Sequence, residues 1–273
     1  MVRTTLMKSL LNSSSSFDYV DGQQFAHEYN WVGLAVSTFY VVAVVFLGPI
    51  FMEKRSPVRA QIWLILWNAC LALLSFGLAF NFTPEFLDMW KKHGFHGTIC
   101  KREGLYQGKT GYWTFLFHLS KFLELGDTIF LVLRKRKVIF LHWYHHTSVL
   151  LVCWYCYQYD TASSRWGLVM NAIIHSIMYS YFFIRAIGIH LPKLLSLTVT
   201  LLQIIQFILG IFICVSLIKI QLFGSADDLK NCEYEPHTAY VHLFMYVGYV
   251  FLFGKFFIRS YCVKPTKNRE KFD

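Results

Sequence analysis

Three histidines, His142, His145 and His146, lie within five positions in the segment LHWYHH, between strongly apolar flanks. Their spacing places all three on one face of a helix. Neutral imidazole acts as a base or a nucleophile near pH 7, and it also binds metal ions. The pattern therefore predicts either a metal site or acid–base or nucleophilic chemistry that is shielded from bulk water.

Three further apolar segments carry polar side chains, which are costly in such surroundings and often functional. Residues 113–133 carry Lys121, Glu124, Asp127 and Thr128, residues 166–186 carry Asn171, His175 and Tyr179, and residues 194–218 carry Thr200, Gln203 and Gln206. Within each segment the polar residues recur on one helical face. Structural ion pairs and hydrogen bonds that hold helices together are the alternative interpretation.

The segments that must position these residues are long and apolar. The chain has 273 residues, of which 55% are hydrophobic and 15% charged, whereas soluble domains average about 25% charged. Stretches of about 20 apolar residues can cross a bilayer as helices. We predict an all-α polytopic membrane protein with seven spans, at residues 31–52, 61–80, 113–133, 138–157, 166–186, 194–218 and 239–261. They form one membrane domain, 31–261, between an N-terminal tail, 1–30, and a basic C-terminal tail, 262–273.

Lys and Arg are divided unequally between the two sets of connections. The set that includes RKRK at 134–137 and the C-terminal tail holds 15 of the 26, which predicts that this set is cytosolic and the N-terminus lumenal. Asn12, in the sequon NSS, is then a predicted glycosylation site. Arg269 and Lys271 resemble a retrieval signal of the endoplasmic reticulum, the membrane in which we expect the protein. A chance match is the alternative for both short motifs.

The polar faces of four spans lie at similar depth in this topology. Asp127, His145, His175 and Gln203 lie seven, eight, ten and ten residues from the nearest cytosolic Lys or Arg along their segments. These separations correspond to roughly 10–15 Å of helix. We therefore expect one polar chamber in the cytosolic half of a helical bundle.

Two of the seven cysteines lie away from the spans. Cys100 and Cys232 fall in the predicted lumenal connections 81–112 and 219–238, and an oxidising lumen permits disulfides. We predict a disulfide that ties these two connections together. Two unpaired thiols are the alternative, because the sequence does not show that the connections meet.

The metal interpretation requires enough ligands. His142, His145, His146 and His175 could hold one zinc ion, but the single His-x-x-His-His box is too small a set for a diiron centre. Catalysis by imidazole itself is the alternative that we favour. An acyl-imidazole needs protection from water, and a neighbouring histidine can orient it or transfer its proton. We therefore expect no metal.

Four motifs in this order resemble those of the ELO family of very-long-chain fatty acid elongases, the 3-ketoacyl-CoA synthases. They are KFLELGDT at 121–128, HWYHH at 142–146, HSIMYSYF at 175–182 and TLLQIIQ at 200–206. The resemblance covers nearly the whole chain. Phe182 replaces the last tyrosine of the family's third motif, so a contact made by that hydroxyl is absent here. ELGDTIF and FLHWYHH look more like the branch that acts on saturated and monounsaturated acyl chains.

The resemblance implies that a long-chain acyl-CoA and malonyl-CoA condense to 3-ketoacyl-CoA, CO2 and CoA, with no cofactor. It also implies that spans two to seven form an inverted barrel around an acyl tunnel, with the first span outside. A net charge of +10 suits the CoA anion. The expected partners are acyl-CoA, malonyl-CoA and the lipid bilayer; other elongation-cycle enzymes and a homo-oligomer are left open, and no nucleic acid is expected.

Roles follow for individual residues. We expect His145 to carry the acyl group as an acyl-imidazole, with His142, His146, His175 and Asp127 as further catalytic residues. Substrate binding is assigned to Lys121, Glu124, Asn171, Tyr179, Gln203, Gln206, Arg134, Lys137 and Lys193. A membrane diiron desaturase or hydroxylase and a non-enzymatic lipid transporter are the alternative functions.

Overall fold

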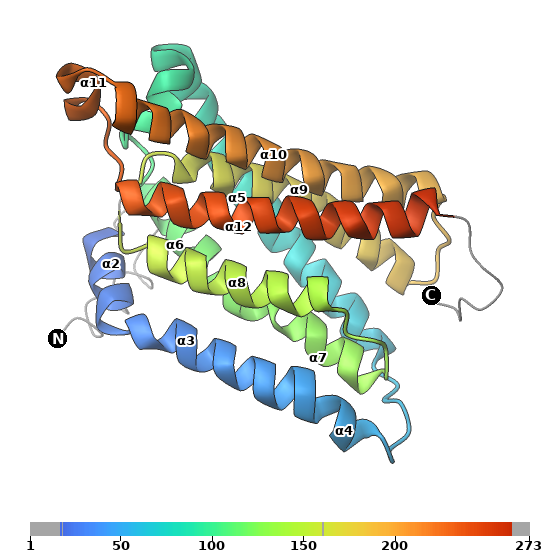
Figure 1. The fold of residues 1–273 in the computed structure, drawn as a ribbon. Coiled ribbons are helices and arrows are strands. Elements are labelled where there is room, and N and C mark those ends of the chain that lie inside the picture. Colours follow the sequence, from blue (N-terminus) through green and yellow to red (C-terminus); the bar gives the residue numbers. More distant parts are fainter. Residues whose placement is uncertain (1–16, 18, 160, 264–273) are drawn as a thin grey trace.

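The computed structural model describes residues 17, 19–159 and 161–263, and within them the chain is helical with no strand. Asn12 and the basic motif with Arg269 and Lys271 lie outside the described residues. The helices are α2 (Tyr19–Glu28), α3 (Asn30–Phe39), α4 (Gly48–Met52), α5 (Gln61–Cys100), α6 (Gly108–Glu124), α7 (Gly126–Leu133), α8 (Phe140–Cys156), α9 (Ser164–Ala186), α10 (Lys193–Phe223), α11 (Ala226–Lys230) and α12 (Pro236–Phe257), with π-helices η1 (Tyr40–Leu47) and η2 (Ile258–Cys262) (Figure 1).

Five helical segments are long and apolar enough to cross a membrane, counted over the described residues. They are Asn30–Met52, Gln61–Cys100, Ser164–Ala186, Lys193–Phe223 and Pro236–Cys262. The protein is therefore a polytopic membrane protein. The two other predicted spans correspond to shorter elements, because Leu125 separates α6 from α7 and α8 has 17 residues.

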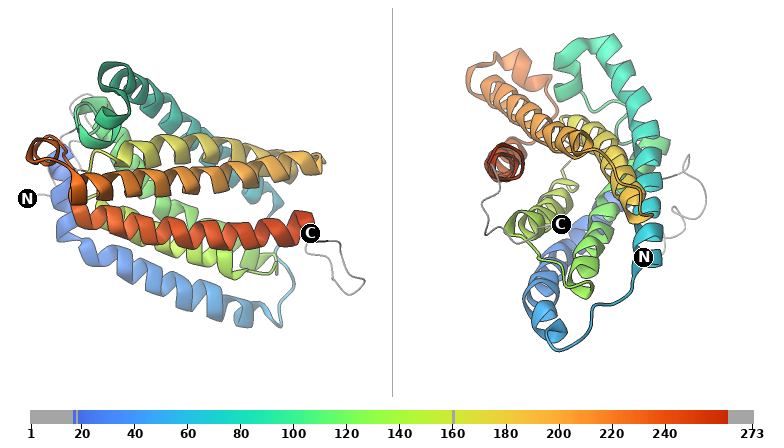
Figure 2. Two further views of the ribbon diagram at one scale, coloured as in Figure 1. Left: turned by 45° about the horizontal axis from the view of Figure 1, so that its top comes forward. Right: turned by 90° about the vertical axis from the view of Figure 1, so that its right-hand side faces the viewer.

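Six long elements are arranged so that each packs against two others. α5 packs along α9, α9 along α10, α10 along α12, α12 along α8, α8 along α6, and α6 along α5. The first span, α3–η1–α4, packs against α7 and α8 (Figure 2). Outward-facing side chains are strongly apolar, as Phe80, Phe223 and Phe244 show with exposures of 75%, 83% and 79%. This is the surface expected of a bundle whose solvent is lipid.

The connections are separated between the two ends of the bundle. The connections 53–60, 134–139 and 187–192 lie at one end, which we call the basic end (Figure 1). The connections 101–107, 157–163 and 224–235 lie at the other, which we call the disulfide end. This separation agrees with the two sets of connections that the sequence predicts.

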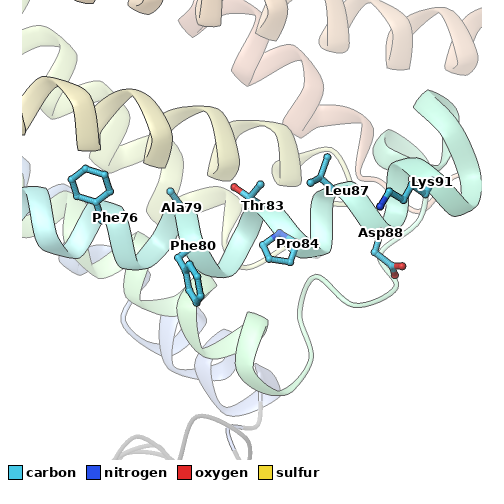
Figure 3. A pocket seen from close by; sticks show the side chains of 8 residues that line it. All are labelled: Phe76, Ala79, Phe80, Thr83, Pro84, Leu87, Asp88 and Lys91. Carbon is cyan, nitrogen blue, oxygen red and sulfur yellow. The ribbon is translucent and has the colours of Figure 1, made fainter.

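α5 is twice as long as the predicted span. Part of the predicted connection 81–112 is helical: the helix continues past Pro84 to Gly94, where a φ of +60° breaks it, and a short helical segment then runs to Cys100. Pro84 cannot donate to the carbonyl one turn earlier, and a shallow groove lies beside it on the outer surface of α5 (Figure 3). All the groove residues belong to α5, and exposed Phe76 and Phe80 are among them. The helix continues because its second half packs along α9.

Arg165, at the start of α9, holds the disulfide end together. Its side chain is 1% exposed, and its Nε donates to both carboxylate oxygens of Glu85 at 2.9 Å. Its Nη1 donates to the carbonyls of Thr98 and Lys101, and its Nη2 to that of Glu103. One guanidinium therefore ties α5, the connection after it and α9 to each other.

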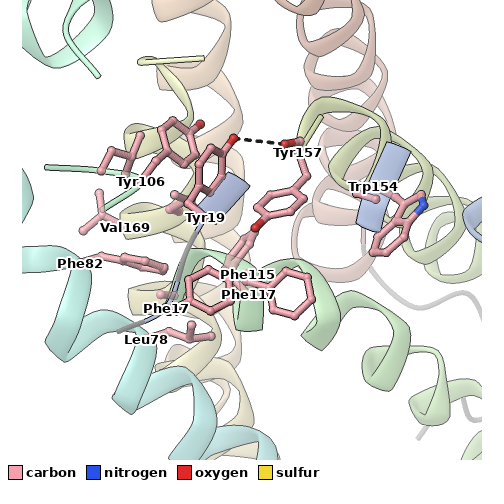
Figure 4. Packing of buried hydrophobic residues seen from close by; sticks show 14 residues of the cluster. Phe17, Tyr19, Leu78, Phe82, Tyr106, Phe115, Phe117, Trp154, Tyr157 and Val169 are labelled. Carbon is pink, nitrogen blue, oxygen red and sulfur yellow. Dashed lines mark hydrogen bonds between the residues drawn. The ribbon is translucent and has the colours of Figure 1, made fainter. Parts of the chain in front are cut away.

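Aromatic side chains fill the interior beside this end. Tyr19 of α2 packs against Tyr106 and Tyr157, with ring centroids 4.6 and 5.7 Å apart. Its hydroxyl donates to the Tyr157 carbonyl at 3.5 Å, and Phe115 packs beside them (Figure 4). α2 therefore closes the bundle at the disulfide end.

Cys100 and Cys232 are joined by a disulfide across 132 residues of sequence. Cys100 ends the short helical segment that follows the break at Gly94, within the predicted connection 81–112. The Glu233 amide donates to the Cys100 carbonyl at 2.7 Å, and the Arg102 amide to the Glu233 carboxylate at 2.8 Å. Hydrogen bonds therefore fix the two segments on both sides of the disulfide.

Removal of this disulfide is expected to lower stability. In the chain-entropy model a crosslink over so long a loop contributes about 5 kcal/mol. Cys232→Ser should therefore lower the thermal unfolding temperature in detergent, whereas Cys70→Ser, at an exposed free cysteine, should leave it unchanged. Non-reducing peptide mapping of membranes alkylated before lysis should yield a linked Cys100–Cys232 peptide pair. Alkylated thiols at both positions would contradict this prediction.

Candidate active site

The three histidines occupy the first turns of α8, near the basic end. The ring centroids of His142 and His146 are 4.5 Å apart, and those of His145 and His146 are 5.5 Å apart. His146 is buried, and His142 and His145 are partly exposed. The one-face cluster that the spacing predicts is therefore present.

Asp127, in the first turn of α7, joins this cluster to two other helices. Its Oδ1 accepts a hydrogen bond from Trp67 Nε1 of α5 at 2.6 Å, and its Oδ2 accepts one from the Tyr179 hydroxyl of α9 at 2.9 Å. His146 Nε2 lies 4.0 Å from the same Oδ2. The carboxylate is therefore oriented by two donors and faces an imidazole. A Cβ at residue 126 would overlap with the Trp67 indole, so Gly126 leaves room for this donor.

A second group surrounds Lys121. Its Nζ donates to Glu124 Oε1 at 2.6 Å and to Asn171 Oδ1 at 2.8 Å. Asn171 Nδ2 lies 3.0 Å from His175 Nε2, and His175 Nδ1 lies 3.6 Å from Glu124 Oε1. The four side chains therefore form a closed ring of polar contacts between α6 and α9, in which Lys121, Glu124 and His175 are buried and Asn171 is partly exposed.

Lys121, Glu124 and Asp127 share a helical face in the sequence, but the structure does not join all three. Lys121 pairs with Glu124, whereas the partners of Asp127 are Trp67, Tyr179 and His146. Six residues along a helix separate Lys121 from Asp127 by about 9 Å, too far for a direct pair. Two adjacent networks result, one beside His175 and one beside His146.

His145 differs from the other histidines in its surroundings. Its ring packs among Tyr249, Phe253 and Phe207, with centroids 4.9, 5.8 and 6.3 Å away. The Tyr249 hydroxyl contacts the backbone carbonyl of His145 at 3.4 Å. Among the described residues, none forms a hydrogen bond with the imidazole nitrogens of His145. An uncharged imidazole in an apolar environment with an available nitrogen is suited to nucleophilic attack.

Other polar atoms of the site are also buried without a partner among the described residues. They include Glu124 Oε2, His146 Nδ1 and Gln206 Oε1. Buried polar groups are usually hydrogen-bonded, so these atoms can take partners from a bound substrate. Over the same part of the chain, no three His, Cys, Asp or Glu side chains are grouped so that they could hold a metal ion.

The match to known proteins covers most of the chain. Residues 25–269 match the model of the ELO family, described as the GNS1/SUR4 family. The chain belongs to the ELO family. It is 37% identical to long chain fatty acid elongase 1 of Caenorhabditis elegans over 256 residues, which is 94% of this chain and 87% of the relative. It is 36% identical to very long chain fatty acid elongase 6 of Drosophila melanogaster over 233 residues, 85% of this chain and 73% of the relative. The identity to very long chain fatty acid elongase 6 of Mus musculus is 35% over 240 residues, 87% and 88% of the two chains.

The other predicted site residues of this ELO chain have other neighbours. Gln203 Nε2 lies 3.3 Å from Met178 Sδ, and Gln206 is buried on the same helix. Arg134 donates to Gln61 at 3.4 Å at the basic end, where Lys137 and Lys193 also lie. Among the described residues, Gln203, Gln206, Arg134 and Lys193 form no hydrogen bond or ion pair with the histidine cluster. The structure therefore does not place these four residues in the two networks of the site.

Two site residues of the ELO chain were missed by the sequence analysis. Trp67 donates to Asp127, and Tyr249 packs against His145. Both are aromatic residues in apolar segments, where such residues usually pack against lipid or core. Trp67 occurs 60 residues before its partner, so no local spacing could indicate the contact.

Proposed function

We propose that the chain is the condensing enzyme of fatty acid elongation, which joins a long-chain acyl-CoA and malonyl-CoA to give 3-ketoacyl-CoA, CO2 and CoA. The observation that carries this proposal is an unpaired imidazole, His145, beside two buried polar networks inside a polytopic membrane protein. The relatives' names, which describe long-chain and very-long-chain fatty acid elongases, support it. The proposed reaction needs no cofactor besides its two thioester substrates.

The first half-reaction forms an acyl-enzyme. A ring nitrogen of His145 attacks the thioester carbonyl, a C–N bond forms, and the C–S bond breaks to release CoA thiolate, which takes up a proton. His142 and His146, whose rings flank the site, supply or accept that proton. Asp127 orients His146 from 4.0 Å. Because an acyl-imidazole hydrolyses readily, the aromatic rings of Tyr249, Phe207 and Phe253 around His145 protect it by limiting the access of water.

The second half-reaction uses malonyl-CoA. Its C–C bond to the carboxylate breaks, CO2 leaves, and the electron pair remains on the α-carbon as an enolate. The α-carbon attacks the acyl-imidazole carbonyl, the C–N bond breaks, and His145 is restored. His175, held by Asn171 and Glu124, lies where it can stabilise the enolate or the departing charge. Lys121, Tyr179, Gln203 and Gln206 orient the substrates in this proposal.

The basic end is the proposed entrance for both CoA esters. Arg134, Lys137 and Lys193 lie there, and cationic side chains favour the approach of the multiply charged CoA. The proposed topology has seven spans, with α6–α7 and α8 added to the five long helices, and spans two to seven surround an acyl tunnel. The circuit of neighbouring helices from α5 to α6 supports it. We place the protein in the endoplasmic reticulum membrane with the disulfide end lumenal, because a disulfide requires an oxidising compartment.

A defined assay tests the proposed activity. Purified protein in detergent, incubated with saturated or monounsaturated long-chain acyl-CoA and [1,3-¹⁴C]malonyl-CoA, should release labelled CO2 and form a 3-ketoacyl-CoA two carbons longer. Release of CO2 should require the acyl-CoA, because malonyl-CoA loses CO2 in the same half-reaction in which it attacks the acyl group. Absence of the 3-keto product from folded protein, with any acyl chain length, would contradict the proposal.

A further inference from the structure

The first span lies outside the circuit of the other helices, yet one of its side chains reaches the histidine cluster. The Tyr40 hydroxyl is 2.6 Å from Thr128 Oγ1, and Thr128 Oγ1 is 2.9 Å from His142 Nε2. Tyr40 is 2% exposed and Thr128 is fully buried. A continuous chain of hydrogen bonds therefore runs from the first span through α7 to the first histidine of α8.

The local structure of the first span fits this contact. Tyr40 is the first residue of the π-helix η1, which interrupts the helical run between α3 and α4. π-Helical turns are rare and frequently occur at functional sites. The ring of Tyr40 packs in a small core with Val45, Leu125 and Leu150. Leu125 separates α6 from α7, the helix that carries Thr128. Tyr40 therefore packs beside the start of the helix that positions Thr128.

The direction of the hydrogen bonds decides the state of His142. The Thr128 hydroxyl has a single proton, so it can donate either to His142 Nε2 or to the Tyr40 oxygen. A phenol is a stronger acid than an aliphatic alcohol, which favours donation by Tyr40 to Thr128. Thr128 then donates to His142 Nε2, and the ring proton of neutral His142 lies on Nδ1.

We propose that Tyr40 is a positioning residue that acts through Thr128 to fix the tautomer and ring orientation of His142. The inference rests on the proposed condensing activity, in which His142 transfers or directs a proton. In its absence the Thr128 hydroxyl can rotate, His142 populates both tautomers, and only part of the enzyme holds the productive form. The first span therefore contributes to turnover without touching substrate.

A double-mutant cycle with Tyr40→Phe and Thr128→Val tests this inference. Tyr40→Phe should lower kcat about three- to tenfold, the size expected for one hydrogen bond, and leave the KM of both substrates unchanged. It should also shift the pH profile of kcat. The double variant should be no slower than Thr128→Val alone, because Tyr40 acts only through Thr128. Thr128→Ser, which keeps the hydroxyl, should retain activity.

Tyr157→Phe is the matched control, because the Tyr157 hydroxyl is buried without a partner among the described residues.

Two outcomes would overturn the inference: an unchanged kcat and pH profile in Tyr40→Phe, or losses in the two single variants that multiply in the double variant. A readout independent of turnover is the ¹⁵N spectrum of [¹⁵N]histidine-labelled protein, with His142 assigned from the signals lost in His142→Gln. The wild type should show His142 with Nε2 unprotonated, and Tyr40→Phe should show a mixture. A protonated Nε2 in neutral His142 of the wild type would also reject the inference. Failure of the proposed function would instead appear as absence of product in the wild type.

Discussion

Replacement of His145 by alanine should abolish the acyl-enzyme and lower turnover by at least about a thousandfold, the scale seen when a catalytic nucleophile is removed. After exposure of the wild type to acyl-CoA without malonyl-CoA, peptide mass spectrometry should place one acyl group on His145. The reason is structural: the imidazole of His145 has no hydrogen-bond partner among the described residues, whereas His142 and His175 are engaged at Nε2.

The control for this experiment is His190→Ala, at an exposed histidine in the connection between α9 and α10. It should keep wild-type turnover and the adduct on His145. An adduct on Cys153, a free cysteine farther along α8, would contradict the assignment, as would retained activity in His145→Ala. Cys153 provides a sharp alternative because it is a nucleophile on the same helix.

Local spacing was sufficient to predict much of the site. Residues three or four apart on a helix share a face, and this rule placed His142, His145 and His146 together. The equal depth of Asp127, His145, His175 and Gln203 predicted that α7, α8, α9 and α10 bring polar residues to one level. For three of these helices the contacts of Asp127 with Tyr179 of α9 and His146 of α8 agree with that prediction.

The contributions of Trp67 and Tyr40 could not be predicted in this way. In a chain with 55% hydrophobic residues, an aromatic residue in a span is most simply explained by lipid or core packing. Their roles depend on partners 60 and 88 residues away, and on the separation of α6 from α7 at Leu125. That information lies in the packing of helices and not in the pattern of any one helix.

The length of α5 was also beyond the sequence pattern. Residues 81–100 contain Pro84 and several charged residues, which ordinarily indicate the end of a span. The helix nevertheless continues past Pro84 as far as the break at Gly94, because this part packs along α9, where Glu85 meets the buried Arg165. The role of Arg165 could not be predicted, because its carboxylate partner is 80 residues earlier in the sequence.

Separation of the pair between Lys121 and Glu124 should cause the largest loss of stability of any single substitution at the site. Both side chains are almost fully buried and 2.6 Å apart. Lys121→Met would leave Glu124 charged in an apolar interior, with the Ser120 hydroxyl at 3.3 Å and His175 at 3.6 Å but no cationic lysine as partner. Breaking a buried pair in this way costs about 3–5 kcal/mol. We expect a clear fall in folded yield and in the thermal unfolding temperature, measured by fluorescence-detected size-exclusion chromatography.

The double variant Lys121→Met, Glu124→Gln separates stability from catalysis. It removes both charges, so the unfolding temperature should recover in part, because no uncompensated charge remains buried. Turnover should stay low, since neither Asn171 nor His175 regains its charged partner.

The surface pair of Lys92 with Asp88 is the matched control. Its charged atoms are 2.7 Å apart, but both side chains are more than half exposed. Lys92→Met should therefore leave both yield and turnover unchanged. Full turnover in the double variant would show that the buried pair serves only to hold α6 and α9 together.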